Sequence, residues 1–351
     1  MARSRKKSRP ISLALQGGGA HGAFTWGVLE RLTECEDIEI KSITATSAGA
    51  MNAAAYISGY QKNGSTGARE ALLDFWQDIS RRGAALYSMK PHHIATEVLG
   101  SNPLLAWTPH SFATAMSSFL SPYDFNPFDL NPLRETVETM IDFEAVRASP
   151  IQLFVAATNV ETGKVRIFEG EELTSEAILA SACLPNTFRA VEIDNVPYWD
   201  GGYLGNPSLF PLFYTDAPRD VLLVILNPLE RKGTPKTAGA IQDRLNEITF
   251  NAALLGELRA IAFVQKLLGQ NWLSKAVQSR YRKLNIHAIR GGEMLRDLSL
   301  ETKYDTSWPF LSNLREKGRD YADEWLGSCL HHVGKQSSID IHETFLDGVE
   351  S

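Results

Sequence analysis

Two glycine-rich turns near the N-terminus carry residues that could together perform acyl transfer. Residues 16–22 read QGGGAHG, and residues 45–49 read ATSAG. The first turn can present bare backbone N–H groups to an oxygen that becomes negatively charged during a reaction. The second can hold Ser47 on a sharp turn between a strand and a helix, which exposes its hydroxyl group. A serine nucleophile and an oxyanion hole are the two halves of an acyl-transfer site.

A serine hydroxyl is a poor nucleophile until a base removes its proton. Asp200, which is followed by two glycines, offers a carboxylate for this role. The small residues Ala45 and Gly49 leave room for a tight turn around Ser47. The N–H of Ala48 can point at the same oxyanion, and a helix that starts there adds partial positive charge. Each motif alone has a structural interpretation, since small-residue turns pack helices on sheets and Asp-Gly pairs form ordinary turns.

Two other interpretations of these motifs remain open. Residues 17–22 also contain the GxGxxG spacing of dinucleotide-binding loops, although no lysine follows as in a Walker loop and no acidic residue ends the second strand. A Ser-His-Asp triad would need a histidine after the acid. The candidates are His287, His331, His332 and His342. Only His287 lies near a predicted strand, and it falls inside that strand.

Taken together, the motifs resemble the patatin-like phospholipase family. The family pattern is a Gly-Gly-Gly-x-Arg/Lys-Gly loop, a Gly-x-Ser-x-Gly elbow and a later Asp-Gly-Gly/Ala. The resemblance extends over residues 10–230. The residues that match the pattern, or replace a member of it, are Gly17, Gly18, Gly19, His21, Gly22, Ala45, Ser47, Gly49, Asp200, Gly201 and Gly202.

The resemblance implies a Ser-Asp dyad in place of a triad. Ser47 would be the nucleophile, Asp200 the general base, and the backbone of residues 17–19 together with Ala48 the oxyanion hole. The implied activity is hydrolysis of carboxylic esters of lipids, of the phospholipase A or lysophospholipase type, through an acyl-enzyme. It implies no metal and no organic cofactor. The alternative is a catalytically silent patatin-like scaffold that binds lipid or a protein partner.

Two positions depart from the family pattern. Ala45 replaces the first glycine of the elbow, and we expect this smallest of substitutions to keep the turn. His21 replaces the usual arginine or lysine, which removes a fixed positive charge beside the oxyanion loop.

The elements around these motifs predict an α/β fold. Short apolar runs at residues 11–15 and 38–44 each precede a glycine-rich turn and a helix-like segment. This order predicts a mostly parallel central sheet with helices on both faces, the three-layer sandwich that the resemblance implies. Ligands bind such sheets at the carboxyl ends of the strands, where both turns lie. Further strands are expected at residues 151–159, 165–168, 196–199, 221–226 and 285–289.

We expect one large domain with extensions. Residues 1–9 form a disordered basic tail, and residues 10–230 form the catalytic domain, with an apolar insertion at 86–132 that is a candidate lid or acyl-chain pocket. Residues 231–335 form a helical C-terminal extension packed on the same domain, and residues 336–351 form a loose tail.

Composition limits the partners. The net charge of −6 argues against nucleic-acid binding, which requires a basic face. Hydrophobic residues make up 44% of the chain, an ordinary value for a soluble globular protein.

We expect a cytoplasmic protein that acts on a lipid or acyl-ester substrate and contacts a membrane surface transiently. The 86–132 insertion is the first candidate for that contact, residues 264–272 are a weaker one, and the basic tail could add attraction to anionic lipid.

Overall fold

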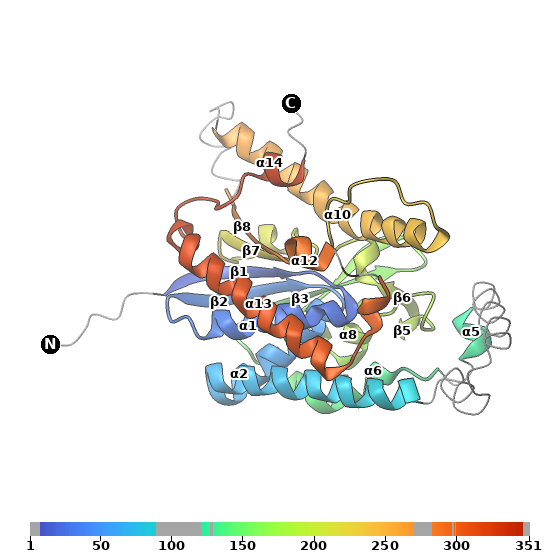
Figure 1. Ribbon diagram of the computed structural model, residues 1–351. Coiled ribbons are helices and arrows are strands. Elements are labelled where there is room, and N and C mark those ends of the chain that lie inside the picture. Colours follow the sequence, from blue (N-terminus) through green and yellow to red (C-terminus); the bar gives the residue numbers. More distant parts are fainter. Residues whose placement is uncertain are drawn as a thin grey trace.

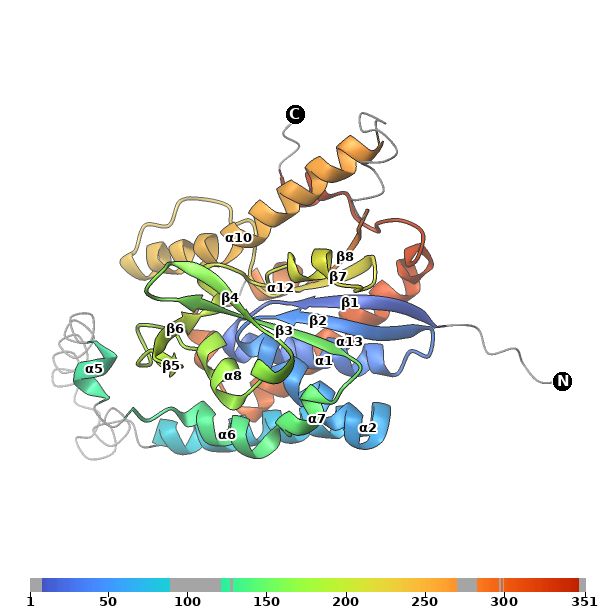
Figure 2. The same ribbon diagram turned by 180° about the vertical axis from the view of Figure 1, so that it is seen from behind.

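The computed structural model describes residues 8–88, 121–126, 129–269, 283–296, 298 and 300–346. These residues form one eight-stranded sheet with helices on both faces (Figures 1 and 2). The predicted α/β class and the mostly parallel sheet are therefore confirmed. The basic tail up to residue 7 and most of the 86–132 insertion lie outside the described residues, as do residues 270–272 of the second candidate membrane surface.

The strands follow the order β5-β6-β3-β2-β1-β7-β8, and β4 pairs with β3 beside this path. Parallel pairing joins β3, β2, β1, β7 and β8, whereas β4 and β6 run antiparallel to β3, and β5 antiparallel to β6. The strands are β1 (Arg9–Leu15), β2 (Ile38–Ala45), β3 (Gln152–Asn159), β4 (Lys164–Phe168), β5 (Val191–Ile193), β6 (Val196–Asp200), β7 (Asp220–Ile225) and β8 (Asn285–Arg290).

The helices connect the strands and flank the sheet. The α-helices are α1 (Gly22–Thr33), α2 (Ala48–Ser88), α5 (Pro122–Phe125), α6 (Pro132–Met140), α7 (Phe143–Arg147), α8 (Ser175–Ser181), α9 (Pro211–Tyr214), α10 (Ala238–Gly269), α12 (Gly292–Arg296), α13 (Trp308–Ser328) and α14 (Ile341–Phe345). The 3-10 helices are η1 (Gly19–His21), η2 (Gly170–Glu172), η3 (Gly201–Tyr203), η4 (Leu300–Tyr304) and η5 (Leu330–His332).

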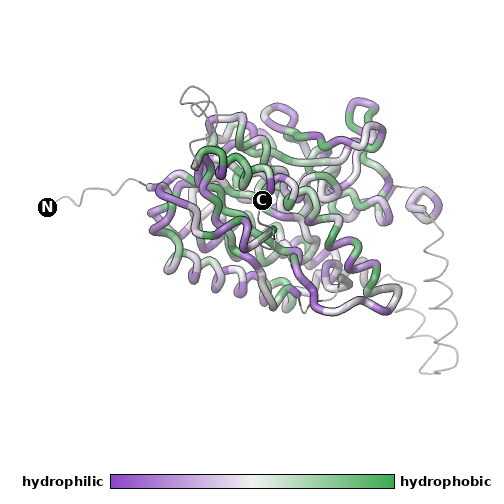
Figure 3. Tube along the Cα trace, turned by 90° about the horizontal axis from the view of Figure 1, so that it is seen from above, coloured by the Kyte–Doolittle hydropathy of each residue, from purple (hydrophilic) through white to green (hydrophobic). Residues whose placement is uncertain are grey.

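Alternation along the central strands creates two apolar cores. Along β7, Leu222 and Val224 pack into the core with α1, α2 and α13, whereas Val221 and Leu223 pack into the core with α10 and α14. Successive strand side chains point to opposite faces of a sheet, so an apolar strand must be covered on both sides. The outer helices show hydrophilic and hydrophobic residues in alternation along their turns, as amphipathic helices do (Figure 3).

The register of the sheet brings the two glycine-rich turns together. β1 and β2 are parallel neighbours, and their last residues, Leu15 and Ala45, are paired. The turns that follow therefore leave the sheet side by side at its carboxyl edge. β6 reaches this region from the opposite direction, and its last residue, Asp200, is paired with Ala157 of β3.

One kinked helix and one helix near the C-terminus stand out from the rest of the fold. α2 consists of two helical stretches that meet at a kink, where Asn63 and Gly64 have non-helical backbone angles. Gly64 has φ +55°, a conformation that glycine adopts without steric cost. In the segment expected to be a loose tail, residues 341–345 form α14, whose Ile341 and Phe345 are buried in the core beneath α10. The apolar spacing of these two residues was the signal for this helix.

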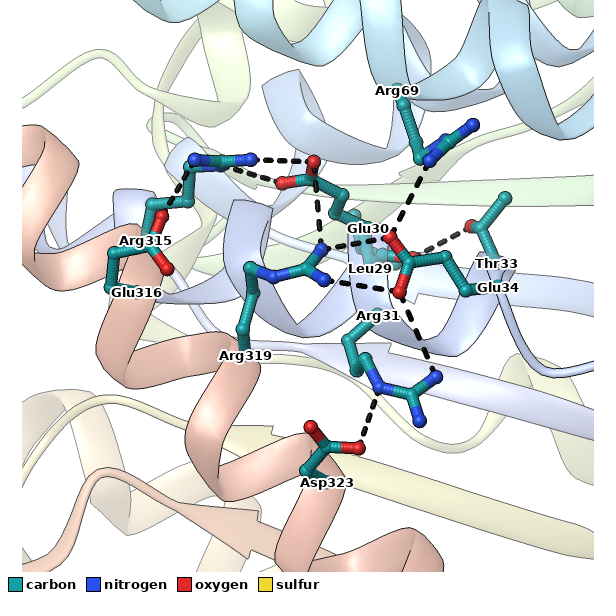
Figure 4. A network of polar contacts seen from close by, with 10 residues as sticks. All are labelled: Leu29, Glu30, Arg31, Thr33, Glu34, Arg69, Arg315, Glu316, Arg319 and Asp323. Atoms are coloured by element: carbon teal, nitrogen blue, oxygen red, sulfur yellow. Dashed lines mark hydrogen bonds and ion pairs between the residues drawn. The ribbon is translucent and has the colours of Figure 1, made fainter.

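The C-terminal helix α13 packs directly on α1. A Cβ atom added to Gly27 would lie 1.9 Å from the carbonyl oxygen of Arg315, and one added to Gly318 would lie 2.0 Å from that of Phe24. The two backbones thus touch at a glycine on each helix. Around this crossing, Arg315 binds Glu30 through two contacts of 2.6 Å, and Arg319 binds Glu34 through two of 3.0 Å (Figure 4).

Among the described residues, no helix is both long and apolar enough to cross a membrane.

The α1–α13 crossing predicts opposite effects of one substitution at two glycines of α13. Gly318→Ala should lower the free energy of unfolding by about 1–3 kcal/mol, because its new methyl group overlaps the backbone of α1. Gly327→Ala, the matched control, should raise it by up to about 1 kcal/mol, because nothing lies within 4 Å of its Cβ position and alanine favours helix. Denaturant unfolding of both variants measures the difference. Equal effects at the two positions would contradict close contact between the helices.

Candidate active site

Ser47 lies on the turn between β2 and α2, in a left-handed backbone conformation with φ +55°. This conformation costs a non-glycine residue about 1–2 kcal/mol. The N–H of Ser47 donates to the hydroxyl oxygen of Ser181 at the end of α8, over 2.8 Å. The turn is closed beneath it, since a Cβ on Gly49 would lie 2.5 Å from the carbonyl oxygen of Leu15. The serine is therefore fixed by its neighbours in a strained turn, as expected of a nucleophile elbow.

The first glycine-rich turn lies directly against this serine. A Cβ added to Gly17 would approach the Cβ of Ser47 to 2.6 Å, and one added to Gly22 would approach that of Ala48 to 2.8 Å. Asn52 ties the two helix starts together, because its side-chain amide donates to the carbonyl oxygens of both Gly22 and Ala48. Glycine is required where backbone must reach within contact of the serine.

Asp200 is brought to the same place from the far side of β3. Its Oδ1 accepts the N–H of Gly202 over 2.7 Å, and the side chain of Ser47 lies near enough to lower the pKa of the carboxyl group. A Cβ on Gly201 would lie 2.1 Å from the carbonyl oxygen of Ala156, so this turn packs tightly on the sheet. The structure thus joins the two residues that the sequence singled out, across a separation of 153 positions in the numbering.

The environment of Asp200 sets its protonation. The residue is 1% exposed, and burial raises the pKa of its carboxyl group to about 7. The hydrogen bond from Gly202, the nearby side chain of Ser47 and the positive charge of Lys303 act in the opposite direction and lower this pKa. A carboxylate with a pKa near neutrality is a much stronger base than an ordinary aspartate, and at neutral pH a large share of it is still ionised.

The structure corrects one member of the predicted oxyanion hole. The N–H of Gly17 is engaged by the side-chain oxygen of Asn206 over 2.7 Å, so it is not free to bind a substrate oxygen. Within the described part of the chain, no acceptor binds the N–H groups of Gly18, Gly19 or Ala48. These three remain as candidate oxyanion donors, and Gly17 has a structural role in holding the loop.

Two polar residues outside the family pattern, Gln16 and Asn227, hold the glycine-rich loop in place. Gln16 Oε1 accepts the N–H groups of Leu226 and Asn227, each over 2.9 Å, which fixes the loop to the end of β7. Asn227 in turn donates its side-chain amide to the carbonyl oxygen of Gly17. The signal for Gln16 was its place between a strand and three glycines. The sequence signal for Asn227 is similar, because this residue directly follows the strand at residues 221–226.

His21 is buried beside the loop and carries no charge at neutral pH. It is 2% exposed, and its Nε2 shares a hydrogen bond of 2.7 Å with the hydroxyl of Thr302. Burial, together with the positive charge of Lys303, lowers the pKa of His21 to about 3. The residue that stands where the family pattern has arginine or lysine is therefore a neutral packing residue.

The histidines considered for a triad lie elsewhere. His287 is fully buried in β8, with Nε2 3.1 Å from Asp220 Oδ1 and Nδ1 3.0 Å from the hydroxyl of Ser338. Asp220 begins β7, at the opposite end of the strand from the glycine-rich turns. None of the four candidate histidines forms a described hydrogen bond with Ser47 or Asp200. The geometry favours the dyad over the triad.

Other features of the described residues do not add to this site. No group of three or more His, Cys, Asp or Glu side chains among them could hold a metal ion. An open hollow of about 300 Å³ lies along α10, lined in part by Arg244, Ile248 and Arg259. None of its lining residues is a candidate catalytic residue.

The patatin-like phospholipase family matches residues 13–213, more than half of the chain. This chain belongs to that family. The match spans both glycine-rich turns and Asp200, and it ends before α10. The family is one of lipid hydrolases, which agrees with a serine and an acid joined at the carboxyl edge of the sheet.

Two solved structures are similar to this patatin-like chain. VipD from Legionella pneumophila has 15% sequence identity and a TM-score of 0.43, and the alignment covers 93% of this chain and 72% of VipD. Full-length ExoU, in complex with full-length SpcU from the type III secretion system of Pseudomonas aeruginosa, has 16% identity and a TM-score of 0.31, with 92% of this chain and 54% of ExoU covered. No curated protein matches the sequence.

The contact between Ser47 and Ser181 predicts a specific stability cost. Ser181→Ala should lower the free energy of unfolding by about 1–3 kcal/mol, because it leaves the buried N–H of Ser47 without an acceptor. Ser312→Ala is the control, since the hydroxyl of Ser312 is buried with no hydrogen-bond partner in the described chain. Ser312→Ala should leave the free energy of unfolding unchanged or raise it. Chemical denaturation of both variants decides, and equal losses would argue against the Ser181 contact.

Proposed function

We propose that this protein hydrolyses carboxylic ester bonds of lipids, as a phospholipase A or lysophospholipase-type serine hydrolase. The observation that carries the proposal is the proximity of the Ser47 side chain to the buried carboxyl group of Asp200, next to the backbone of the glycine-rich loop. Family membership supports the substrate class. The mechanism below follows from the positions of these groups.

In the acylation step, the carboxylate of Asp200 takes the hydroxyl proton of Ser47 as Oγ attacks the ester carbonyl carbon. The C=O electron pair moves onto the oxygen, and the tetrahedral oxyanion binds the N–H groups of Gly18, Gly19 and Ala48. Preorganised donors of this kind contribute about 3–4 kcal/mol each to transition-state stabilisation. The C–O bond to the leaving alcohol then breaks, and that alcohol takes the proton from Asp200.

In the deacylation step, water replaces the alcohol. Asp200 takes a proton from the water as its oxygen attacks the acyl carbon of the Ser47 ester. Collapse of the second tetrahedral intermediate breaks the bond to Ser47 Oγ, which recovers its proton from Asp200. A free fatty acid leaves, and both residues return to their starting states.

Access to a membrane-borne substrate is part of the proposal. Acyl chains are available only at an aggregate or bilayer surface, so the enzyme must contact that surface transiently. The 86–132 insertion lies mostly outside the described residues. Within it, Tyr123 and Leu130 are described, and 53% and 71% of their surfaces are exposed. These two residues are compatible with contact at a lipid surface.

The proposal predicts that both members of the dyad are required. Ser47→Ala and Asp200→Asn should each lower turnover of p-nitrophenyl butyrate by about 10³-fold or more, because one loses the nucleophile and the other the base. A fluorophosphonate probe should label wild type and should not label Ser47→Ala. A folded wild type that neither turns over nor labels would overturn the proposal and favour a lipid-binding or partner-binding scaffold.

The pKa of Asp200 predicts the pH dependence. Its carboxyl group must be ionised to act as base, and its pKa is raised to about 7. On the acidic side, kcat/KM should therefore fall about tenfold per pH unit below 7. A pH series with the soluble ester measures this limb. An acid limb near pH 4, the value of an ordinary aspartate, would show that the buried carboxylate is not the base.

A further inference from the structure

The glycine-rich loop contacts a segment from outside the matched family domain. η4 lies far beyond residue 213 in the sequence, yet a Cβ on Gly19 would come within 2.5 Å of the carbonyl oxygen of Lys303. Gly19 has φ +59°, so its backbone is turned toward this segment in a conformation that favours glycine. The neighbouring Thr302 bonds His21 of the same loop. The C-terminal extension thus packs directly against the glycine-rich loop.

The ammonium group of Lys303 is connected to the loop through one amide. Its Nζ donates to Oδ1 of Asn227 over 2.7 Å, and Nδ2 of Asn227 donates to the carbonyl oxygen of Gly17 over 3.2 Å. Asn227 is 2% exposed, so this relay is shielded from water. A charge-assisted hydrogen bond that is shielded from solvent is stronger than a hydrogen bond between neutral groups.

The charge of Lys303 acts on the dyad. The charged groups that face its ammonium are Asp200, Glu247, Asp243 and Arg231. Burial and Arg231 lower the pKa of Lys303 to about 8, and the three acids act against them. At neutral pH the group is therefore mostly a cation, and it lowers the pKa of Asp200. His21, which lies beside it, is neutral.

The glycine-rich loop and Lys303 each lead into a helix, and these two helices pack on each other. α1 starts at the end of the glycine-rich loop, and α13 starts five residues after Lys303. The Glu30–Arg315 and Glu34–Arg319 pairs join these two helices (Figure 4). The Phe310 ring of α13 also packs on the His21 ring, at 6.2 Å between centroids. These contacts join α13, which follows Lys303 in the chain, to α1 and the glycine-rich loop.

We propose that Lys303, contributed by the C-terminal extension, is the positioning cation of this active site and replaces the loop arginine or lysine of the family pattern, which is His21 here. Its ammonium holds the glycine-rich loop through Asn227, and its field stabilises the negative charge on Asp200 and on the tetrahedral oxyanion. This inference rests on the proposed esterase function. It makes the C-terminal extension a component of the catalytic apparatus.

The test compares Lys303→Met, which removes the charge from a side chain of similar length, with Lys303→Arg, which keeps it. Lys317→Met is the matched control, because Lys317 is exposed on α13 and pairs only with Asp320, at 3.6 Å, among the described residues. The readout is the pH dependence of kcat and KM on p-nitrophenyl butyrate, a small neutral ester with no head group for a cation to bind. Circular dichroism and thermal unfolding check that each variant is folded.

Lys303→Met should lower kcat about 10- to 100-fold with little change in KM, because the lost interaction acts on developing charge. Its acid limb should move to higher pH, since loss of a neighbouring cation raises the pKa of Asp200. Wild type should also lose activity above about pH 8, where the ammonium of Lys303 deprotonates. That alkaline limb should be absent from Lys303→Met and Lys303→Arg, and Lys303→Arg should keep most of the neutral-pH activity. Lys317→Met should match wild type throughout.

An active wild type together with a Lys303→Met variant that keeps wild-type kcat and both pH limbs would overturn this inference and leave the esterase function intact. Loss of activity in Lys303→Met without movement of the limbs would also overturn it, because a purely structural lysine would behave in that way. Should Lys303→Met not fold, the Lys303→Arg profile decides alone, since an alkaline limb unchanged from wild type contradicts the role. A folded wild type that neither turns over nor labels removes the esterase function itself.

Discussion

The contact between two backbone turns, with no side chain between them, is the constraint on which the rest of this structure depends. Gly17 meets Ser47 at a distance that excludes even a methyl group, and Gly22 meets Ala48 in the same way. Parallel pairing of β1 and β2 brings the turns to one edge, but only glycine lets them close onto each other. Ser47 is held in its left-handed conformation because Ser181 accepts its N–H, and the stability of the surrounding sheet outweighs the local strain.

In the proposed mechanism, burial gives Asp200 the basicity that a histidine provides in a triad. An exposed aspartate is too weak a base to activate a serine, and desolvation at the end of β6 corrects this by raising the pKa of Asp200. Stronger desolvation would raise the pKa of Asp200 further and leave it protonated at neutral pH, and a protonated carboxylic acid cannot act as a base. The hydrogen bond from Gly202, the nearby Ser47 side chain and the charge of Lys303 limit the rise in pKa. The balance between burial and these contacts places the carboxylate near the pH at which it must work.

The residues beyond the matched family region pack on that region through two kinds of contact. β8 extends the central sheet beside β7, and α13 lies on α1 with a glycine from each helix at the crossing. The arginine and glutamate pairs that surround this crossing are partly shielded, which gives them more effect than freely exposed ion pairs have. The family match ends at residue 213, yet the glycine-rich loop is completed by residues beyond 300.

The sequence by itself determined the local features of this protein. Three consecutive glycines after a strand, a serine between small residues and an Asp-Gly-Gly turn predicted the parts of the site, and apolar periodicity predicted the parallel sheet and the helices beside it. These signals are local, because a turn or strand depends mainly on its own residues. Only the tertiary structure decided that Asn206 occupies the N–H of Gly17, that His287 pairs with Asp220 away from the dyad, and that Lys303 stands beside the loop. Each of these facts depends on contacts between residues far apart in the chain, and no pattern within a single segment encodes such a contact.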